Sequence, residues 1–211
     1  MGSEMCIRDS TTVQILLLDK SADVNLCNKH GRSPFSSACH NGHDTIVKLL
    51  LQSGADVISK TNFGRSALLL PCFYGHYNTV QLLLEGGADV NLYDEDGFGP
   101  LHNACQNGHD TIVQLLLDNS ADVNLCNKHG VSPFFSACQN GHDTTVQLLL
   151  GKGVNINLKT NSGLCPLYTA CFNGHDNTVR ILLEGGADVN LKTNRGQSPL
   201  YAACFNGHDS T

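Results

Sequence analysis

The chain has 211 residues, of which 15% are charged and 6% are aromatic, and its formal net charge is −6 at pH 7. That charge is spread along the sequence without a basic stripe, which argues against nucleic acid or an anionic membrane surface as the main partner. The apolar runs, such as residues 15–18, are far too short to span a bilayer, so we expect no membrane insertion. No secretory signal is visible.

The first 27 residues differ from the rest of the chain. Residues 1–9, MGSEMCIRD, match no later segment, and we interpret them as an artefactual segment outside the fold. Residues 10–27 have the pattern of one apolar-faced helix, and we interpret them as an N-terminal half repeat of the unit described next.

An internal repeat of 33 residues organises the remainder. The string ACQNGHDTIVQLLLDNSADVN at 104–124 returns at 137–157 as ACQNGHDTTVQLLLGKGVNIN, and glycines and Gly-His pairs recur at the same offset. A fixed period of this length indicates a stack of repeats rather than a closed globule. Units one to five, followed by a truncated sixth unit, are 28–60, 61–93 (divergent), 94–126, 127–159, 160–192 and 193–211.

Unit four shows how each repeat is built. Ser132 suits a helix N-cap and Pro133 the first helical position. Gly141 is expected to end this helix as a left-handed cap, and Asp143 to begin a second helix. Helices this short are unstable in isolation, so each unit must bury its apolar face on its neighbours. The sequence therefore predicts an all-α solenoid of helix–turn–helix units.

Six cysteines recur at the 33-residue period. One structural position per unit places successive thiols about 8–10 Å apart in a helical stack, whereas a disulfide needs Cα atoms within about 7 Å. We therefore expect free, buried thiols in a reducing compartment, and an intracellular, cytoplasmic protein. These residues are Cys39, Cys72, Cys105, Cys138, Cys171 and Cys204.

The repeated string resembles a known family. The segments GFGPLHNACQNGHDTIVQLLLDNSADVN at 97–124 and GQSPLYAACFNGHD at 196–209 are similar to the ankyrin repeat. This resemblance covers nearly the whole chain and implies helix pairs with a β-turn finger at each junction, stacked into a curved array. It also implies binding of partner proteins through the fingertips and the first helix of each pair. The chain resembles a fragment of a longer array.

Metal binding and catalysis are the less favoured interpretations. Two His/Cys groupings, His102 with Cys105 and His109, and Cys39 with His40 and His43, invite a zinc hypothesis, as do the Cys-x-x-His pairs at 27–30 and 126–129. Zinc needs three or four convergent ligands, and none of these groupings recurs as a closed site. A catalytic role would require six equivalent nucleophiles, so packing in the core is the favoured role of the six cysteines. No nucleotide, hydrolase or metalloprotease motif is present. We expect no metal, no cofactor and no enzymatic activity.

Unit two is the strongest candidate for partner recognition. It has Ala67 where other units have proline, and Pro71 within the first helix should distort that helix. Aromatic residues and arginine are enriched at binding hot spots. Drift of this unit with internal packing of the rings remains the alternative. The candidate residues are Phe63, Arg65, Phe73, Tyr74 and Tyr77, with Phe98 on the next finger.

The fingertips carry charges whose sign alternates along the stack. Such tips would suit a partner of mixed charge, although an ordinary solvated tip remains the alternative for any one residue. The candidates for partner contact are Glu95, Asp96, Lys128 and His129, and the other polar tips are Lys29, His30, Arg32, Asn194 and Arg195.

We therefore expect a monomeric protein-binding scaffold for an unidentified protein partner. A regulatory or targeting array attached to an enzymatic or signalling domain elsewhere in a longer protein is the alternative, and a structural spacer is a weaker one. The family resemblance further implies Asn91 as a candidate substrate for asparaginyl hydroxylation, with Asn124 and Asn190 in similar contexts. An ordinary turn asparagine is the favoured alternative.

Overall fold

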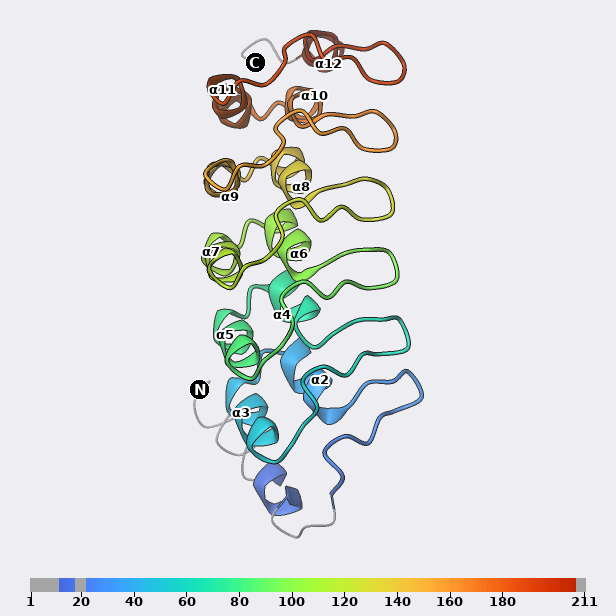
Figure 1. The fold of residues 1–211 in the computed structure, drawn as a ribbon, viewed down its shortest axis with the longest axis vertical. Helices are drawn as coiled ribbons and strands as arrows, with labels where there is room; N and C mark the ends of the chain where they lie inside the picture. The colour runs from blue at the N-terminus through green and yellow to red at the C-terminus, as the bar shows by residue number, and fades with distance from the viewer. Residues whose placement is uncertain (1–11, 18–21, 208–211) are drawn as a thin grey trace.

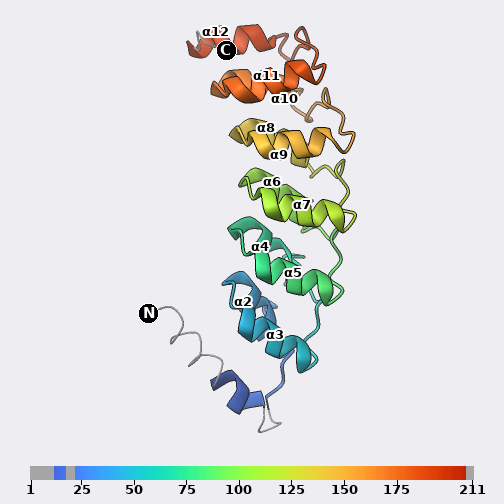
Figure 2. The same ribbon diagram turned by 90° about the vertical axis from the view of Figure 1, so that its left-hand side faces the viewer.

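The computed structural model describes residues 12–17 and 22–207, and it is an elongated stack of helix pairs (Figure 1). Successive pairs lie in successive layers along the long axis (Figure 2). The described residues contain one isolated bridge, between Lys60 and Ser66, and no sheet. The predicted all-α solenoid is confirmed.

Two columns of helices run along the stack (Figure 1). The first helices of the units are α2 (Pro34–His40), α4 (Leu69–Tyr74), α6 (Pro100–Gln106), α8 (Pro133–Asn140), α10 (Pro166–Asn173) and α12 (Pro199–Asn206). The second helices are α3 (Asp44–Gln52), α5 (Tyr77–Glu85), α7 (Asp110–Asp118), α9 (Asp143–Leu150) and α11 (Asp176–Glu184). Residues 12–17 are also helical. Loops that we call fingers project from the side of the first helices.

The local sequence explains where the first helices begin and end. In α8 the hydroxyl of Ser132 accepts the N–H of Phe135 at 3.0 Å, and Pro133 is the first helical residue. Gly141 ends the helix with φ of 70°, a left-handed conformation that costs other residues a steric penalty. The predicted cap chemistry of unit four is confirmed.

The second helices are held by bonds to neighbouring units. The carboxylate of Asp143 accepts the hydroxyl of Thr178, 35 residues later. His142 Nε2 lies 3.0 Å from the carbonyl oxygen of Gln106 in the preceding unit. Each loop between the two helices therefore contacts the previous unit, and each second helix contacts the next.

The hydrophobic core is one continuous layer between the two helix columns. Val146 and Leu149 of α9 are fully buried, as are Leu83 of α5 and Leu182 of α11. All described cysteines are free. Five of the six periodic cysteines are buried as predicted, but Cys204 is exposed. It lies on α12, which packs on α10 and has no described unit on its other side.

Candidate functional site

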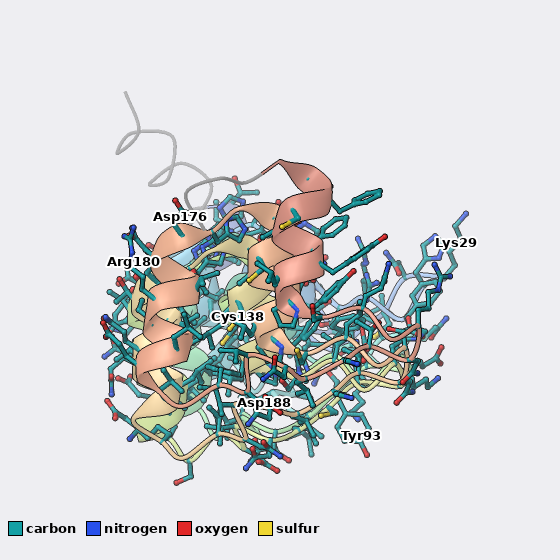
Figure 3. The ribbon with its side chains drawn as sticks, turned by 90° about the horizontal axis from the view of Figure 1, so that it is seen from above. Lys29, Tyr93, Cys138, Asp176, Arg180 and Asp188 are labelled. Atoms are coloured by element: carbon teal, nitrogen blue, oxygen red, sulfur yellow. The ribbon has the colours of Figure 1, made fainter. Side chains whose placement is uncertain are left out.

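One side of the stack is formed by the first helices and the fingers, and we call it the finger face. Figure 3 shows Lys29 at a finger tip, on the opposite side of the molecule from Asp176 and Arg180 of α11. The six fingers are residues 27–32, 60–65, 93–98, 126–131, 159–164 and 192–197.

Each finger is a tight turn that is fixed to its neighbour. In the fourth finger the N–H of Asn127 donates to the carbonyl of Val131 at 3.0 Å, and Asn127 Oδ1 accepts the N–H of His129. Asn161 of the next finger donates its side-chain amide to the carbonyl of Lys128 at 2.9 Å. Such bonds hold successive fingers in register, so side chains at equivalent positions form rows along the stack.

Unit two forms a groove on the finger face, which we call the α4 groove. Its volume is about 330 Å³, and it extends from α4 to the next finger and α6. Arg65 and Asp94 face one another across it at 3.9 Å. Its lining includes the predicted residues Arg65, Phe73, Tyr74 and Phe98, together with Leu69 and Leu70.

The exposed ring of Tyr74 sits in an aromatic cluster. His40 stacks on it with a centroid separation of 5.3 Å, and His76 stacks on it at 6.0 Å. Phe73 meets it edge-on at 5.1 Å. Burial lowers the pKa of His40, with smaller contributions from Arg32 and His76. His40 is therefore mostly neutral near pH 7, which favours stacking rather than charge as its contribution to this surface.

Tyr74 occupies a position that is asparagine in the other units. There the asparagine amide bonds a backbone carbonyl, as Asn140 does with Ser136 and Asn173 with Gln139. Tyrosine cannot make the same amide bond, and half of its surface is exposed. Large exposed aromatic rings of this kind are typical of binding surfaces.

The first helix of unit two departs from the others at its start. Pro71 was expected to distort this helix, and α4 is shorter than the other first helices. It begins at Leu69, two residues later than α2 begins in its own unit, and Pro71 falls in the first turn. Backbone N–H groups in a first turn have no partner within the helix, so proline removes no helical bond there.

The late start of α4 leaves one polar atom without a partner. Ser33 and Ser132 cap their helices by accepting the N–H three residues later. The hydroxyl of Ser66, at the equivalent position, is buried and has no hydrogen-bond partner in the described part of the chain. Unit two therefore lacks the usual first-helix cap.

A second groove, the α10 groove, lies at the equivalent place in unit five. Its volume is about 400 Å³, and seven of its ten lining residues match those of the α4 groove at an offset of 99 residues. Phe172 takes the place of Phe73 and Tyr168 the place of Leu69. The hydroxyl of Tyr168 donates to Gln197 Oε1 at 3.2 Å, which ties α10 to the next finger.

Four aromatic residues of units five and six were not predicted as candidates from the sequence: Tyr168, Phe172, Tyr201 and Phe205. The ring of Phe172 stacks with that of Tyr168, and the ring of Phe205 with that of Tyr201. The signal was present, because Phe172 and Phe205 occupy the same place in the 33-residue period as Phe73. Reading each position along all units, instead of inspecting the divergent unit alone, would have found them.

The predicted site residues do not all come together. Phe63 is exposed on the second finger and borders a small recess with Arg65. Glu95 and Lys128 line a shallow hollow between the third and fourth fingers. Asp96 and His129 are exposed on those same fingers.

Tyr77 lies apart from these groups. It is the first residue of α5, a second helix, and it does not line the α4 groove. In other units this position is aspartate, which bonds a threonine of the next unit, as Asp110 bonds Thr145. Ile112 stands where that threonine would be for Tyr77. Both members of the hydrogen-bonded pair are thus replaced at this one interface.

Positive charge predominates on the fingers, beyond the alternation of sign that the sequence predicted. Eight of the chain's 13 Lys and Arg residues lie there, and all eight are exposed. Only three of its 19 Asp and Glu residues do, and all three are on the third finger. The repeat period aligns charges that are scattered along the sequence. The eight are Lys29, Arg32, Lys60, Arg65, Lys128, Lys159, Lys192 and Arg195.

The buried thiols are poor nucleophiles. Burial raises the pKa of the Cys39 thiol to about 12 and that of Cys171 to about 11, so both are protonated at neutral pH. Among the residues that the structure describes, no three His, Cys, Asp or Glu side chains converge in a way that could hold a metal ion. No described helix has the length and apolar character needed to cross a membrane.

Asn91 is held between two units. Its amide donates to the carbonyl of Ser120 at 3.3 Å, and its Oδ1 accepts the N–H of Asp122 at 2.8 Å. Asn25 and Asn157 accept the equivalent N–H groups of Asp56 and Asp188. The asparagine thus has a structural role, and its hydroxylation stays a prediction.

The architecture by itself defines the class of protein. Short helix pairs at a fixed period, with fingers along one edge, form a solenoid of helical repeats. The family model described as "Ankyrin repeats (3 copies)" matches residues 4–94, 87–160 and 145–211. The chain belongs to the ankyrin repeat family. Ankyrin repeats are generally protein–protein interaction modules and are typically non-catalytic. A search of curated proteins found no match.

Proposed function

We propose that the chain binds a partner protein through its finger face, with the α4 and α10 grooves as the principal contact points. The observation that carries the proposal is the occurrence of two apolar grooves on one face, each with an exposed phenylalanine from a first helix. Apolar pockets rimmed by polar groups are the usual place for hot spots, because a partner side chain is fully desolvated there.

The edges of the two grooves supply specificity. Arg65, Asp94 and Asn103 surround the α4 groove, whereas Gln139, Arg195 and Gln197 surround the α10 groove. Charges at a groove rim direct the approach of a partner and penalise a wrong one more than they add affinity. The face can therefore hold a partner without any covalent step, and recognition rests on shape and surface complementarity.

Affinity capture with matched variants tests this proposal. The finger-face variant is Phe73→Ala with Phe172→Ala, and the control is Gln81→Ala with Gln147→Ala, which changes exposed residues of two second helices. We expect the finger-face variant to lose the proteins that the unaltered chain captures, and the control to retain them. Circular dichroism checks that both variants keep the same helical content. Equal capture by all three proteins would contradict the proposal.

A further inference from the structure

The two grooves are copies of one feature, three units apart. Nine of the ten residues that line the α10 groove have a counterpart 99 positions earlier within or beside the α4 groove, and Phe172 corresponds to Phe73. Units three and four, between them, have Gln106 and Gln139 at this position and present no such ring. The finger face therefore offers two similar apolar sites separated by a polar interval.

The spacing of the sites limits what can occupy both. Helices in contact lie about 8–10 Å apart, so three units separate the grooves by roughly 24–30 Å. An extended polypeptide advances about 3.3 Å per residue and covers this distance in roughly seven to nine residues. A single protein segment can thus reach both grooves.

The charge around the grooves favours an acidic occupant. The first helices, which form the floor of the finger face, contain no Asp, Glu, Lys or Arg. The fingers above them carry eight positive and three negative residues. Lys159, Lys192 and Arg195 lie on the two fingers that flank the α10 groove, and those fingers have no acidic residue. At the α4 groove, by contrast, Arg65 faces Asp94.

We infer that the finger face binds one extended acidic segment of a partner protein, which places two large apolar side chains, seven to nine residues apart, in the α4 and α10 grooves. This inference rests on the proposed function and specifies its partner. The more acidic half of the segment lies over the α10 groove. Repulsion between its own carboxylates keeps such a segment extended before it binds.

A nucleic acid is less suited to this face than an acidic polypeptide. The third finger, with Asp94, Glu95 and Asp96, forms the edge of the α4 groove toward unit three and would repel a uniformly charged phosphate backbone. A protein segment, in contrast, can place an uncharged or basic residue opposite the third finger. The apolar grooves also accept aliphatic side chains, which nucleic acids lack.

Selection from a displayed library of random peptides about 16 residues long, enough to span both grooves, tests the inference directly. We expect the enriched peptides to be acidic and to share two large apolar residues seven to nine positions apart. Enrichment of neutral or basic peptides, of peptides with one anchor, or of none would overturn it.

Fluorescence anisotropy with an enriched peptide tests the assignment of the grooves. We expect Phe73→Ala and Phe172→Ala each to weaken binding at least about 10-fold, as is usual for a hot-spot anchor. The charge reversals Lys192→Glu and Arg195→Glu together should weaken it by a similar factor and flatten its dependence on salt. The matched control, Lys152→Glu with Arg180→Glu on the side of the second helices, should leave the affinity within about twofold, because distant exposed charges are screened.

Single-stranded oligo-dT of comparable length serves as the nucleic-acid probe. Binding of oligo-dT as tight as that of the peptide, and lost in the same charge-reversal variant, would overturn the inference. If capture of cellular proteins depends on Phe73 and Phe172 while no acidic peptide binds, the proposed function stands and this inference fails. If neither is observed, both fail.

Discussion

Units two and five present matching grooves on unlike helices. In unit five, α10 begins at Pro166, directly after Cys165, whose sulfur accepts the N–H of Tyr168. In unit two, α4 is shorter, begins later and leaves the hydroxyl of Ser66 without a partner. Yet Phe73 and Phe172 reach the same position. Both residues lie in the part of the first helix that is helical in both units, so the start of that helix does not determine where the groove phenylalanine lies.

The comparison of units two and five predicts that their second helices contribute equally to the free energy of unfolding. This is the largest effect that we expect. Leu83 of α5 and Leu182 of α11 are equivalent and fully buried. Replacing either with alanine should lower the free energy of unfolding by about 2–5 kcal/mol, because a cavity replaces a packed side chain. Urea unfolding of the two variants measures this. A much smaller loss for Leu83→Ala would show that unit two is loosely packed throughout.

The next effect concerns the helix caps. Ser132→Ala removes a cap bond and should lower the free energy of unfolding by about 0.5–2 kcal/mol. Ser66→Ala removes a buried hydroxyl that has no partner, so stability should stay constant or rise by up to about 1 kcal/mol. Thermal unfolding of both variants distinguishes the two cases, and equal losses would mean that Ser66 does cap α4.

A smaller effect on stability is expected at the interface between units two and three, because it lacks the hydrogen bond between aspartate and threonine. Ile112→Thr alone should destabilise the protein, because it buries a hydroxyl where Tyr77 offers no carboxylate. Adding Tyr77→Asp should recover part of the loss. A double-mutant cycle should give a coupling of about 0.5–1.5 kcal/mol, the usual net value of one hydrogen bond. Purely additive effects would contradict the assignment of this pair.

The smallest expected effect is a dependence of stability on pH that arises in unit three. There His102 occupies the position that Leu69 has in unit two. His102 Nδ1 accepts the N–H of Gly99 at 3.3 Å, so Nε2 carries the proton that it shares with the carbonyl of Val131 at 2.9 Å. Burial lowers the pKa of His102 below its usual 6.5, although the Val131 bond and Asp94 act in the opposite direction.

Because the folded state prefers neutral His102, its contribution to stability is present above the unfolded pKa near 6.5 and is lost as pH falls through the lower folded value. Unfolding measured between neutral and mildly acidic pH should show this loss. The His102→Gln variant, which cannot titrate, should show a flatter dependence. If stability depends on pH identically in both proteins, His102 is not the group responsible.

Local chemistry made most of the fold predictable from the sequence. Ser132, Pro133 and Gly141 each act as their residue types suggest, and the 33-residue period defines the stack. The effect of Pro71 was not predictable in the same way, because it depends on where α4 begins. In α4 the distortion takes the form of a late start, with Leu68 and Leu69 both buried.

The candidate site was only partly predictable. Phe73, Tyr74 and Phe98 are unusual for their positions and drew notice for that reason. Phe172 stands in a regular unit and did not. The pairing of the two grooves and the charge of the fingers depend on register between units, since residues 99 positions apart become equivalent only when the stack is assembled.

The interlocked fingers have a consequence for how such a chain can change in length. A Cβ on Gly130, whose φ is 71°, would lie 2.6 Å from Asn161 Oδ1 of the adjacent finger. An insertion of one or two residues within a finger would place a residue with a side chain at this position or shift Asn161, whereas a whole extra period would leave every such contact intact. Gene duplication could then lengthen the array only in complete steps, and the distance between the two phenylalanines would change by whole units.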